Sequence, residues 1–544
     1  MRKMQEQEYD IIVIGAGHNG EAIAAYLAKA GLKVLLLERR LEVGGGLAAE
    51  EITKVGFLHN IHSIYHMAVD FAPPYQDLNL EELGVRYVYP DVQVAFPLKD
   101  GRAIILYADP EQSVRSISKV SEKDGEVYRR VYEKYKRFTE EIIIPATYVP
   151  PLPATDQIAL LERTELGSEF LGLSERTPID VVNELFVDER VKALMLYLIT
   201  MWGLQYDLSG LGYLIPLYFN RATNYRLCIG TSHKLSSALT RAIYLNGGMI
   251  LDNAEVVKII VESGEAKGVV LADGRRIMAS KAVVSTLDPP QTFLKLVGKE
   301  NLDEDFAYEV EGWEWEQLSL FTVHLALKEP PKYTASISNP DVDRALICVL
   351  GFETVDELTK AIDDARRGKL THIVGNATCP TLFDPTQAPP GFHTALFENP
   401  YTPYDLAEIG AEGWDTIRYD YLERCLNLWR EYAPNITDKN ILKAAAYTPL
   451  DIERKLSTMV KGSIKHGAYI PTQMGYFRPN MRCSHYRTPI KKLYVGGAST
   501  YPGGLITFGP GYNVVNAITE DLGIKKWWKE PEYITKAREK GYIP

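Results

Sequence analysis

Several residue patterns that mark specialised proteins are missing from this chain of 544 residues. The five cysteines (228, 348, 379, 425 and 483) form no Cys-x-x-Cys pair, so neither a zinc cage nor a disulfide framework is indicated. Basic residues (60) are fewer than acidic residues (71), and the net charge of −11 argues against nucleic acid as a partner. We find no internal repeat and no low-complexity segment.

The sequence also lacks a long apolar run. Residues 191–206 form the longest mostly apolar stretch, which is shorter than the roughly 20 residues that span a bilayer. The first residues are basic and then acidic, unlike the start of a signal peptide. Hydrophobic residues make up 46% and charged residues 24%, as in globular proteins, so we expect a large cytoplasmic protein.

Strand and helix signals alternate at both ends of the sequence. An apolar run at 9–14 ends at Gly15, a helix of small residues is predicted at 20–30, and a second buried strand at 34–37. Residues 493–522 repeat this strand-and-helix pattern. The pattern predicts one α/β domain that a second domain interrupts.

The middle of the sequence differs from its ends. We predict helices within 111–135 and 179–200, and strands within 247–288 with a hairpin turn at Asp273-Gly274. The predicted fold is therefore α/β, with a discontinuous Rossmann-like domain and a mixed α+β substrate domain. We assign residues 1–70, 221–298 and 481–524 to the Rossmann-like domain, 71–220 and 299–480 to the substrate domain, and 525–544 to a C-terminal tail.

A dinucleotide-binding fingerprint lies in the first predicted turn. It reads Gly15-Ala16-Gly17-His18-Asn19-Gly20, between a strand and a helix. Gly15 permits the tight turn, Gly17 lets the backbone approach a pyrophosphate, and Gly20 lets the helix pack closely on the strand. The helix N-terminus adds free N–H donors for the phosphates. Glu38, at the end of the next strand, can accept hydrogen bonds from a ribose diol.

The residues after Glu38 distinguish FAD from NAD. Arg39 and Arg40 precede a second glycine turn, which contains Gly45 and Gly46. Such a segment suits the longer FAD molecule, and we expect these four residues to contact it. We find no second fingerprint in a strand–helix context, so a separate NAD(P)H site is not predicted and quinone or oxygen is the expected electron acceptor.

These motifs resemble the flavoprotein family of the bacterial phytoene desaturases and carotene isomerases, whose opening pattern is GAGxNG, E-x-R and GG. Residues 253–259, 493–504 and 511–513 resemble further landmarks of that family. The resemblance implies a glutathione-reductase-type fold, FAD, and a hydrophobic substrate. It also implies cofactor contacts at Val256, Gly497, Thr507, Phe508, Tyr512 and Asn513.

Two departures from the family pattern concern the flavin end. Gly497 stands where relatives often carry an acid, so backbone N–H groups would have to hold the ribityl chain. Leu505 and Phe508 interrupt a glycine-rich run and would narrow the cavity, which leaves a ring-shaped substrate and a long polyene as alternatives. Because residues 498–504 contain no cysteine, we expect FAD to bind non-covalently.

Histidines supply the candidate catalytic groups. His59, His62 and His66 would share one face of a helix, but no carboxylate or thiolate is adjacent, so we predict no metal. His62 and His66 follow a segment that approaches the flavin in relatives, and His466 lies in a loop that faces their substrate cavity. We predict proton transfer for these three residues, with a purely structural role as the alternative.

The leading hypothesis is an FAD-dependent oxidoreductase that dehydrogenates a hydrophobic isoprenoid or alicyclic substrate to form a C=C bond. The alternatives are a redox-neutral double-bond isomerase that uses reduced FAD, an amine oxidase-type flavoenzyme and a non-catalytic flavin-bound scaffold. The apolar stretch at 187–206 predicts a core helix, or else a membrane-docking face. Trp527 and Trp528 in the tail indicate either peripheral contact with a membrane or packing on the body. The sequence does not determine the oligomeric state.

Overall fold

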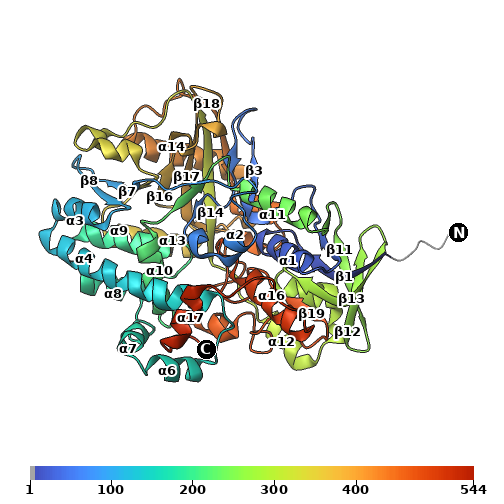
Figure 1. Ribbon diagram of the computed structural model, residues 1–544. Helices are drawn as coiled ribbons and strands as arrows, with labels where there is room; N and C mark the ends of the chain where they lie inside the picture. The colour runs from blue at the N-terminus through green and yellow to red at the C-terminus, as the bar shows by residue number, and fades with distance from the viewer. Residues whose placement is uncertain (1–6) are drawn as a thin grey trace.

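The computed structural model describes residues 7–544, and its first large sheet forms the Rossmann-like domain (Figure 1). Its strand order is β10-β2-β1-β13-β12-β11, with β19 paired to β13. The pairs among β10, β2, β1, β13 and β19 are parallel, whereas β11–β12–β13 is an antiparallel meander. The strands are β1 (Gln7–Ile14), β2 (Val34–Leu37), β10 (Met249–Leu251), β11 (Val256–Glu262), β12 (Glu265–Leu271), β13 (Arg276–Ser285) and β19 (Leu493–Val495).

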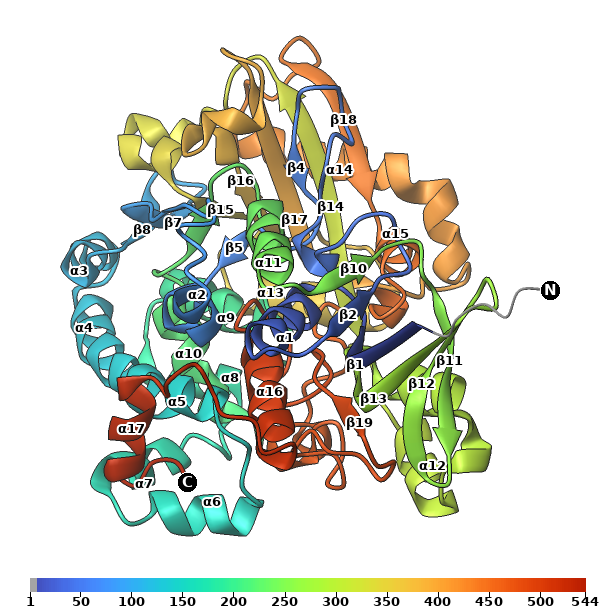
Figure 2. The same cartoon turned by 45° about the vertical axis from the view of Figure 1, so that its right-hand side comes forward.

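Three helices from distant parts of the chain lie beside this sheet. Figures 1 and 2 both show α1 (His18–Lys29) between α11 (His233–Leu245) and α16 (Gly509–Asp521). The residues of α1 from Asn19 to Ala28 are all buried, and most of them are alanine, isoleucine or leucine. Both α1 and α16 follow a parallel strand of the sheet, so their N-termini meet at the same edge.

The second sheet has the order β18-β14-β17-β16-β15-β7-β8, and α14 (Trp414–Tyr432) packs on it. Its strands are β7 (Val92–Pro97), β8 (Ala103–Tyr107), β14 (Leu318–Leu327), β15 (Ile347–Leu350), β16 (Gly375–Thr378), β17 (His393–Pro403) and β18 (Ile441–Tyr447). The remaining α-helices are α2 (Pro73–Asp77), α3 (Pro110–Ser118), α4 (Glu122–Arg137), α5 (Ile144–Thr147), α6 (Ala154–Leu161), α7 (Glu165–Leu171), α8 (Pro178–Leu185), α9 (Glu189–Thr200), α10 (Ile215–Arg221), α12 (Glu304–Glu311), α13 (Val355–Arg366), α15 (Pro449–Lys455) and α17 (Glu532–Glu539).

The two large sheets draw their strands from the residue ranges that the sequence assigns to the two domains. A small sheet, β5-β9-β6, crosses that division. It pairs β5 (Tyr65–His66) and β6 (Tyr87–Val88) with β9 (Arg226–Cys228). A two-stranded sheet, β3 (Ala49–Glu50) and β4 (His59–Asn60), lies near the second sheet in Figure 2. The division at residue 70 therefore separates paired strands, and the domain boundaries stay a prediction.

Each of the two helical stretches predicted in the middle of the chain holds two helices. The stretch 111–135 contains α3 and α4, and the Ser121 side chain accepts a hydrogen bond from Asp124 N to begin α4. The stretch 179–200 contains α8 and α9, and Asp188 caps α9 in the same way. Such caps satisfy the free N–H groups of a first turn and so favour a new helix start.

The apolar stretch at 187–206 forms a core helix, as one of its two explanations predicts. Nearly every residue of α9 from Val191 onward is buried. No helix in residues 7–544 is long and apolar enough to cross a membrane.

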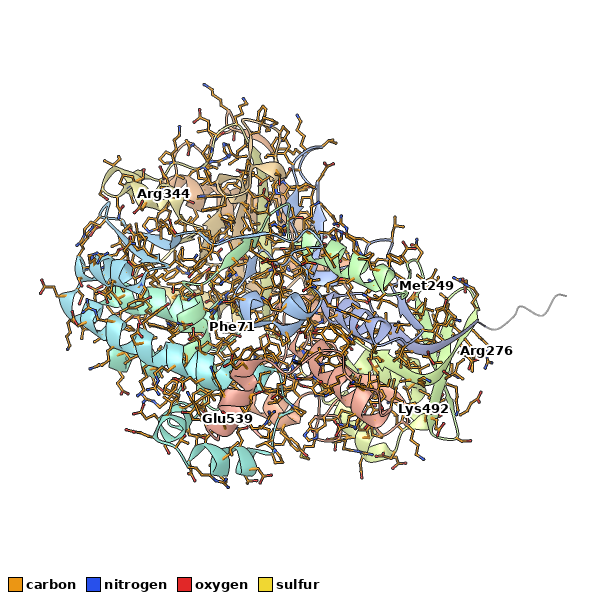
Figure 3. All side chains as sticks on the ribbon, in the orientation of Figure 1. Phe71, Met249, Arg276, Arg344, Lys492 and Glu539 are labelled. Atoms are coloured by element: carbon orange, nitrogen blue, oxygen red, sulfur yellow. The ribbon has the colours of Figure 1, made fainter. Side chains whose placement is uncertain are left out.

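The C-terminal tail packs on the body of the protein. The Trp527 indole donates to Tyr26 O at 3.1 Å, and Trp528 meets the Tyr26 ring edge-on with 5.0 Å between centroids. Tyr533 of α17 donates to Phe71 O at 2.6 Å, and Figure 3 shows Phe71 near the middle of the molecule, among side chains from several elements. Trp527 and Trp528 therefore pack on the body of the protein, as one of the two explanations of the tail predicts.

Candidate active site

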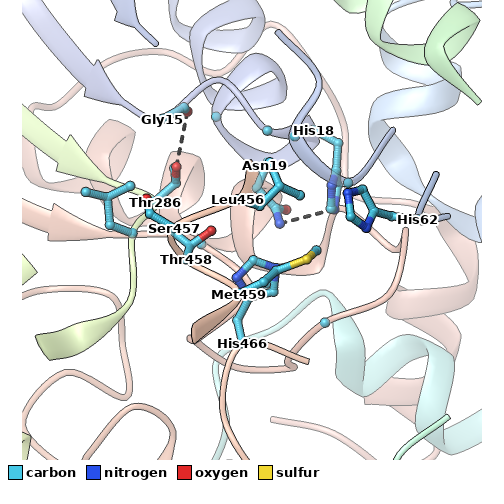
Figure 4. A pocket seen from close by; sticks show the side chains of 18 of the residues that line it. Gly15, His18, Asn19, His62, Thr286, Leu456, Ser457, Thr458, Met459 and His466 are labelled. Carbon is cyan, nitrogen blue, oxygen red and sulfur yellow. Dashed lines mark hydrogen bonds between the residues drawn. The ribbon is translucent and has the colours of Figure 1, made fainter. Parts of the chain in front are cut away.

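A large cavity lies between the carboxyl edge of the first sheet and the second domain (Figure 4). Its two ends differ in character. One end is formed by the glycine turns, Glu38 and the start of β11, and the other is largely apolar and aromatic. The apolar end includes Ile64, Tyr65, Met67, Trp202, Leu320, Ile464, Leu505 and Ile506. An extended polar molecule can therefore bind at the glycine-turn end of the cavity, and an apolar molecule can bind beside it at the apolar end.

The fingerprint glycines have distinct roles in the geometry. Gly15 has φ +94°, a conformation that favours glycine. A methyl group on Gly20 would lie 2.0 Å from Gly15 O, so only glycine lets α1 approach the turn this closely. A methyl group on Gly17 would meet no protein atom within 4 Å, because that backbone faces the open cavity. The turn thus presents bare backbone and the N-terminus of α1 to the cavity.

His18 and Asn19 line the cavity at the start of α1, as Figure 4 shows. Asn19 Oδ1 accepts from Gly511 N at 3.1 Å, which ties α1 to α16. Its Nδ2 lies 3.2 Å from His18 Nε2. Burial lowers the pKa of His18 to about 4, so its imidazole is neutral at physiological pH.

Glu38 is fixed in place at the end of β2. One carboxylate oxygen accepts from Ala16 N at 2.9 Å and the other from Arg40 N at 3.0 Å. The side chain still lines the cavity, so its remaining lone pairs can accept from a ribose diol. Val256, together with Ala254, forms the wall beside it at the start of β11.

Arg39 and Arg40 line the cavity but also connect the two domains. Both guanidinium groups donate to the carbonyl of Lys455, each at 3.1 Å. Gly45 has φ +53°, and a methyl group there would lie 3.1 Å from Gly17 Cα. Gly45 and the neighbouring Gly46 line the cavity, so the second glycine turn packs against the first and extends the cradle.

The flavin end, as predicted from the resemblance, is only partly in the cavity lining. Gly497 lines it, and a methyl group there would lie 2.0 Å from Thr286 O. Thr507, Phe508, Tyr512 and Asn513 are absent from the lining of this cavity. In their place the loop before α16 contributes Gly504, Leu505 and Ile506.

Three of these four residues contact other parts of the protein. Phe508, at φ +61°, meets the His18 ring edge-on with 5.2 Å between centroids. Tyr512 packs on Tyr26, and Asn513 donates to Thr147 O and to the Tyr486 hydroxyl. α16 begins at Gly509, so Tyr512 and Asn513 lie close to its N-terminus.

The histidines between residues 59 and 66 do not lie on a helix. The segment forms β4 and β5 with a turn between them, so the three rings point to different surroundings. His62 lines the cavity, and its Nε2 is buried without a hydrogen-bond partner. His66 does not line it: Nδ1 lies 2.7 Å from the Tyr87 hydroxyl and Nε2 lies 3.2 Å from Ser232 Oγ. Both of its nitrogens are therefore occupied within the protein.

His466 reaches the cavity from the loop between Gly462 and Gly467, opposite His62 in Figure 4. Its backbone has φ +57°, and its carbonyl accepts from Ser499 Oγ at 2.8 Å. Burial lowers the pKa values of His62 and His466 to about 3, so both imidazoles are neutral and weakly basic. Within residues 7–544, no group of three His, Cys, Asp or Glu side chains is arranged to hold a metal.

Sequence reasoning did not identify several residues of the apolar end. Tyr65 and Trp202 are brought together there by β5 and by the end of α9. Lys465 also lines the cavity, although it is 1% exposed. Its place beside His466, in the loop between Gly462 and Gly467, is the sequence feature that could have predicted this position in the cavity.

The open backbone at Gly17, the fixed Glu38 carboxylate and the continuous cavity from Val256 to Gly497 fit an extended FAD molecule. Together with the two-sheet architecture, these features define the class of FAD-dependent oxidoreductases.

Known proteins support this class. A model of the Thi4 family matches residues 1–54, which hold β1, α1 and β2. A subunit of the limonene dehydrogenase from Castellaniella defragrans is 42% identical to this chain over 553 residues, or 99% of each chain. The lycopene-forming phytoene desaturase of a Paracoccus species is 26% identical over 90% of this chain and 93% of that one. A crystal structure of an oxidoreductase from Methanosarcina mazei shares the fold, with a TM-score of 0.58 and 19% identity over 94% of this chain and 100% of that one.

The chain belongs to the family of FAD-dependent oxidoreductases that includes this limonene dehydrogenase and the phytoene desaturases. The resemblance predicted from the motifs is thereby confirmed. The chain is an enzyme, which sets aside the hypothesis of a non-catalytic scaffold.

Proposed function

We propose that the enzyme removes two hydrogens from a hydrophobic terpenoid of compact, ring-containing shape and so forms a C=C bond. The observation that carries this proposal is the apolar end of the cavity, which is continuous with the dinucleotide cradle. The similarity to the limonene dehydrogenase of Castellaniella defragrans supports a cyclic monoterpene as the substrate class. We infer a compact shape from Trp202 and Leu505, two bulky side chains that line the cavity.

When bound, FAD supplies the two-electron acceptor for this chemistry. The chain's own residues bind, orient and exclude water. Glu38 and the glycine turns hold the adenosine half, while Arg39 and Arg40 keep the second domain against the first. The apolar wall of Ile64, Trp202 and Leu320 surrounds the substrate and removes water from it.

We further propose that FAD binds without a covalent link and that a quinone or oxygen reoxidises it. All five cysteines are buried, and none lines the cavity, so no thiol is placed to attach the flavin. The neutral imidazole of His62 carries a buried nitrogen without a partner, which favours a hydrogen bond to the bound cofactor.

The proposal is tested by product analysis. The FAD-loaded protein is incubated with limonene and an artificial quinone, and separately with the long polyene phytoene. We expect mass spectrometry to find a limonene product lighter by two hydrogens and no phytoene product. A product of unchanged mass, formed only after the flavin is reduced in advance, would instead identify the double-bond isomerase. Conversion of phytoene alone would refute the compact substrate class.

A further inference from the structure

We propose that Lys465, rather than a histidine, is the catalytic residue that accepts the substrate's proton in the cavity. This inference rests on the proposed dehydrogenase function. It assigns a proton acceptor, a role that neither the similarity to known proteins nor the cofactor-binding residues identify. It follows from the position of the side chain, from the absence of a counter-ion beside its amine, and from the weak basicity of the neighbouring histidines.

The Lys465 side chain is enclosed within the protein but reaches the cavity surface. Its Nζ lies 5.8 Å from the ring centroid of Tyr218 in α10 and 5.5 Å from that of Tyr469. Two glycines leave room for its chain: a methyl group on Gly504 would lie 3.1 Å from Lys465 Cα, and one on Gly203 would lie 3.5 Å from Cγ. The amine thus lies beside two aromatic rings, and the Lys465 side chain lines the cavity.

No carboxylate in residues 7–544 lies within ion-pair distance of this amine. The nearest acid that affects it, Glu316, is occupied by the backbone of the same loop. Glu316 accepts from Lys465 N at 2.5 Å and from Gly467 N at 3.3 Å, and it also accepts from the Ser463 hydroxyl. The acid therefore fixes the loop and does not pair with the Lys465 amine.

Arg478 holds the loop from the other side. It is fully buried, and its guanidinium donates to Lys465 O at 2.9 Å and to Ala498 O at 3.1 Å. This connection fixes Lys465 relative to the cavity-lining turn after β19. It also places a second positive charge close to the amine, which disfavours the protonated form of Lys465.

The remaining titratable groups around the amine are uncharged. Burial raises the pKa values of Tyr213, Tyr218 and Tyr469 above the ordinary range, and it lowers the pKa of His466 to about 3. Burial also lowers the pKa of Lys465 to about 7, although Glu316 acts in the opposite direction. A substantial fraction of Lys465 is therefore the free amine near neutral pH. The amine is a much stronger base than the imidazoles of His62 and His466.

The proposed step balances in atoms and electrons. Bound FAD would accept the hydride of one substrate C–H bond, and Lys465 Nζ would take the proton of the adjacent C–H bond. The electron pair of that second bond becomes the π bond of the product. The substrate is oxidised, the flavin is reduced, and the ammonium later returns its proton to solvent.

The kinetic test compares Lys465→Met, Lys465→Arg and the exposed loop control Lys461→Met. Each FAD-loaded protein is mixed with limonene without oxygen, and the rate of flavin reduction is followed against pH. For the wild-type protein and the control we expect a rate that rises with pH and has a midpoint near 7. For both Lys465 variants we expect a rate at least about a hundredfold lower, without that midpoint. Arginine keeps the charge but cannot accept a proton, so a Lys465→Arg protein with the wild-type rate would overturn the proposal.

A second measurement does not depend on turnover. The wild-type holoenzyme is labelled briefly with acetic anhydride across a pH series, and mass spectrometry follows acetylation of Lys465 and of Lys461. We expect Lys465 to become reactive around pH 7. Reactivity that appears only under strongly alkaline conditions would overturn the proposal even if limonene is oxidised. Flavin that limonene fails to reduce in the wild-type protein would instead refute the dehydrogenase function and, with it, the proposed proton transfer.

Discussion

Two glycines of the fingerprint allow the cofactor site to be tested separately from the fold. Gly20→Ala would place a methyl group 2.0 Å from Gly15 O, so α1 must move away from the turn. Overpacking of this kind costs about 1–3 kcal/mol, and the better helix propensity of alanine returns up to about 1 kcal/mol. We therefore expect the flavin-free protein to lose roughly 1–2 kcal/mol of unfolding free energy.

Gly17→Ala should behave in the opposite way. Its φ of −75° and ψ of 170° suit alanine, and the methyl group meets no protein atom within 4 Å. The unfolding free energy of the flavin-free protein should change by less than about 0.5 kcal/mol. The methyl group would, however, occupy space that the pyrophosphate needs, so FAD affinity should fall at least about tenfold, or about 1.4 kcal/mol.

Urea unfolding with and without FAD, combined with a flavin fluorescence titration, separates these two effects. The expected pattern is a stable Gly17→Ala protein that binds FAD poorly, and a destabilised Gly20→Ala protein. A Gly17→Ala protein that binds FAD as tightly as the wild-type protein would refute the placement of the pyrophosphate at this turn.

Three further predictions follow from single side chains. Glu38→Gln replaces one acceptor oxygen with an NH2 donor that faces Arg40 N or Ala16 N. FAD affinity should therefore fall by about 1–2 kcal/mol in a fluorescence titration. Unchanged affinity would contradict the role of Glu38. Trp528→Ala removes a buried indole, so thermal unfolding should show a loss of about 3–5 kcal/mol with an unaltered flavin spectrum. Burial raises the pKa of Glu398 from 4.5 to about 7, so the folded state binds more protons and stability should fall by up to roughly 3 kcal/mol as pH rises through that window. Glu398→Gln should flatten this dependence, and an equally steep profile would contradict it.

The fingerprint and its neighbours were predictable because their roles depend on local backbone geometry. Glycine is favoured at position 15 by a positive φ and at position 20 by a close contact with the Gly15 carbonyl. Both requirements arise within one turn, so the spacing of the glycines in the sequence indicates them. Glu38 follows from the length of the β-α-β unit. The same local motifs carried the predictions of the fold class and of the flavoprotein family, and both predictions are confirmed.

Other parts of the site depend on contacts between distant segments. Lys465 acquires its surroundings from Tyr218 and Gly203, more than two hundred residues earlier in the chain. The spacing of His59, His62 and His66 suits a helix, but pairing of β4 with β3 and of β5 with β9 makes the segment extended. That pairing turns His66 toward Tyr87 and leaves His62 in the cavity.

The motif of Tyr512 and Asn513 marks the start of a helix, but the partners of both side chains come from distant segments. Tyr512 packs on Tyr26, and Asn513 donates to Thr147 O. Neither residue lines the cavity, and cofactor contact at these two positions stays a prediction.

Anaerobic flavin absorbance tests the central claim most directly. The purified, FAD-loaded wild-type protein is mixed with one equivalent of limonene in the absence of oxygen and of any other acceptor. We expect the visible flavin bands to bleach and one equivalent of product, lighter by two hydrogens, to form. Flavin bands that persist with limonene and with other cyclic terpenes would contradict the proposed dehydrogenase.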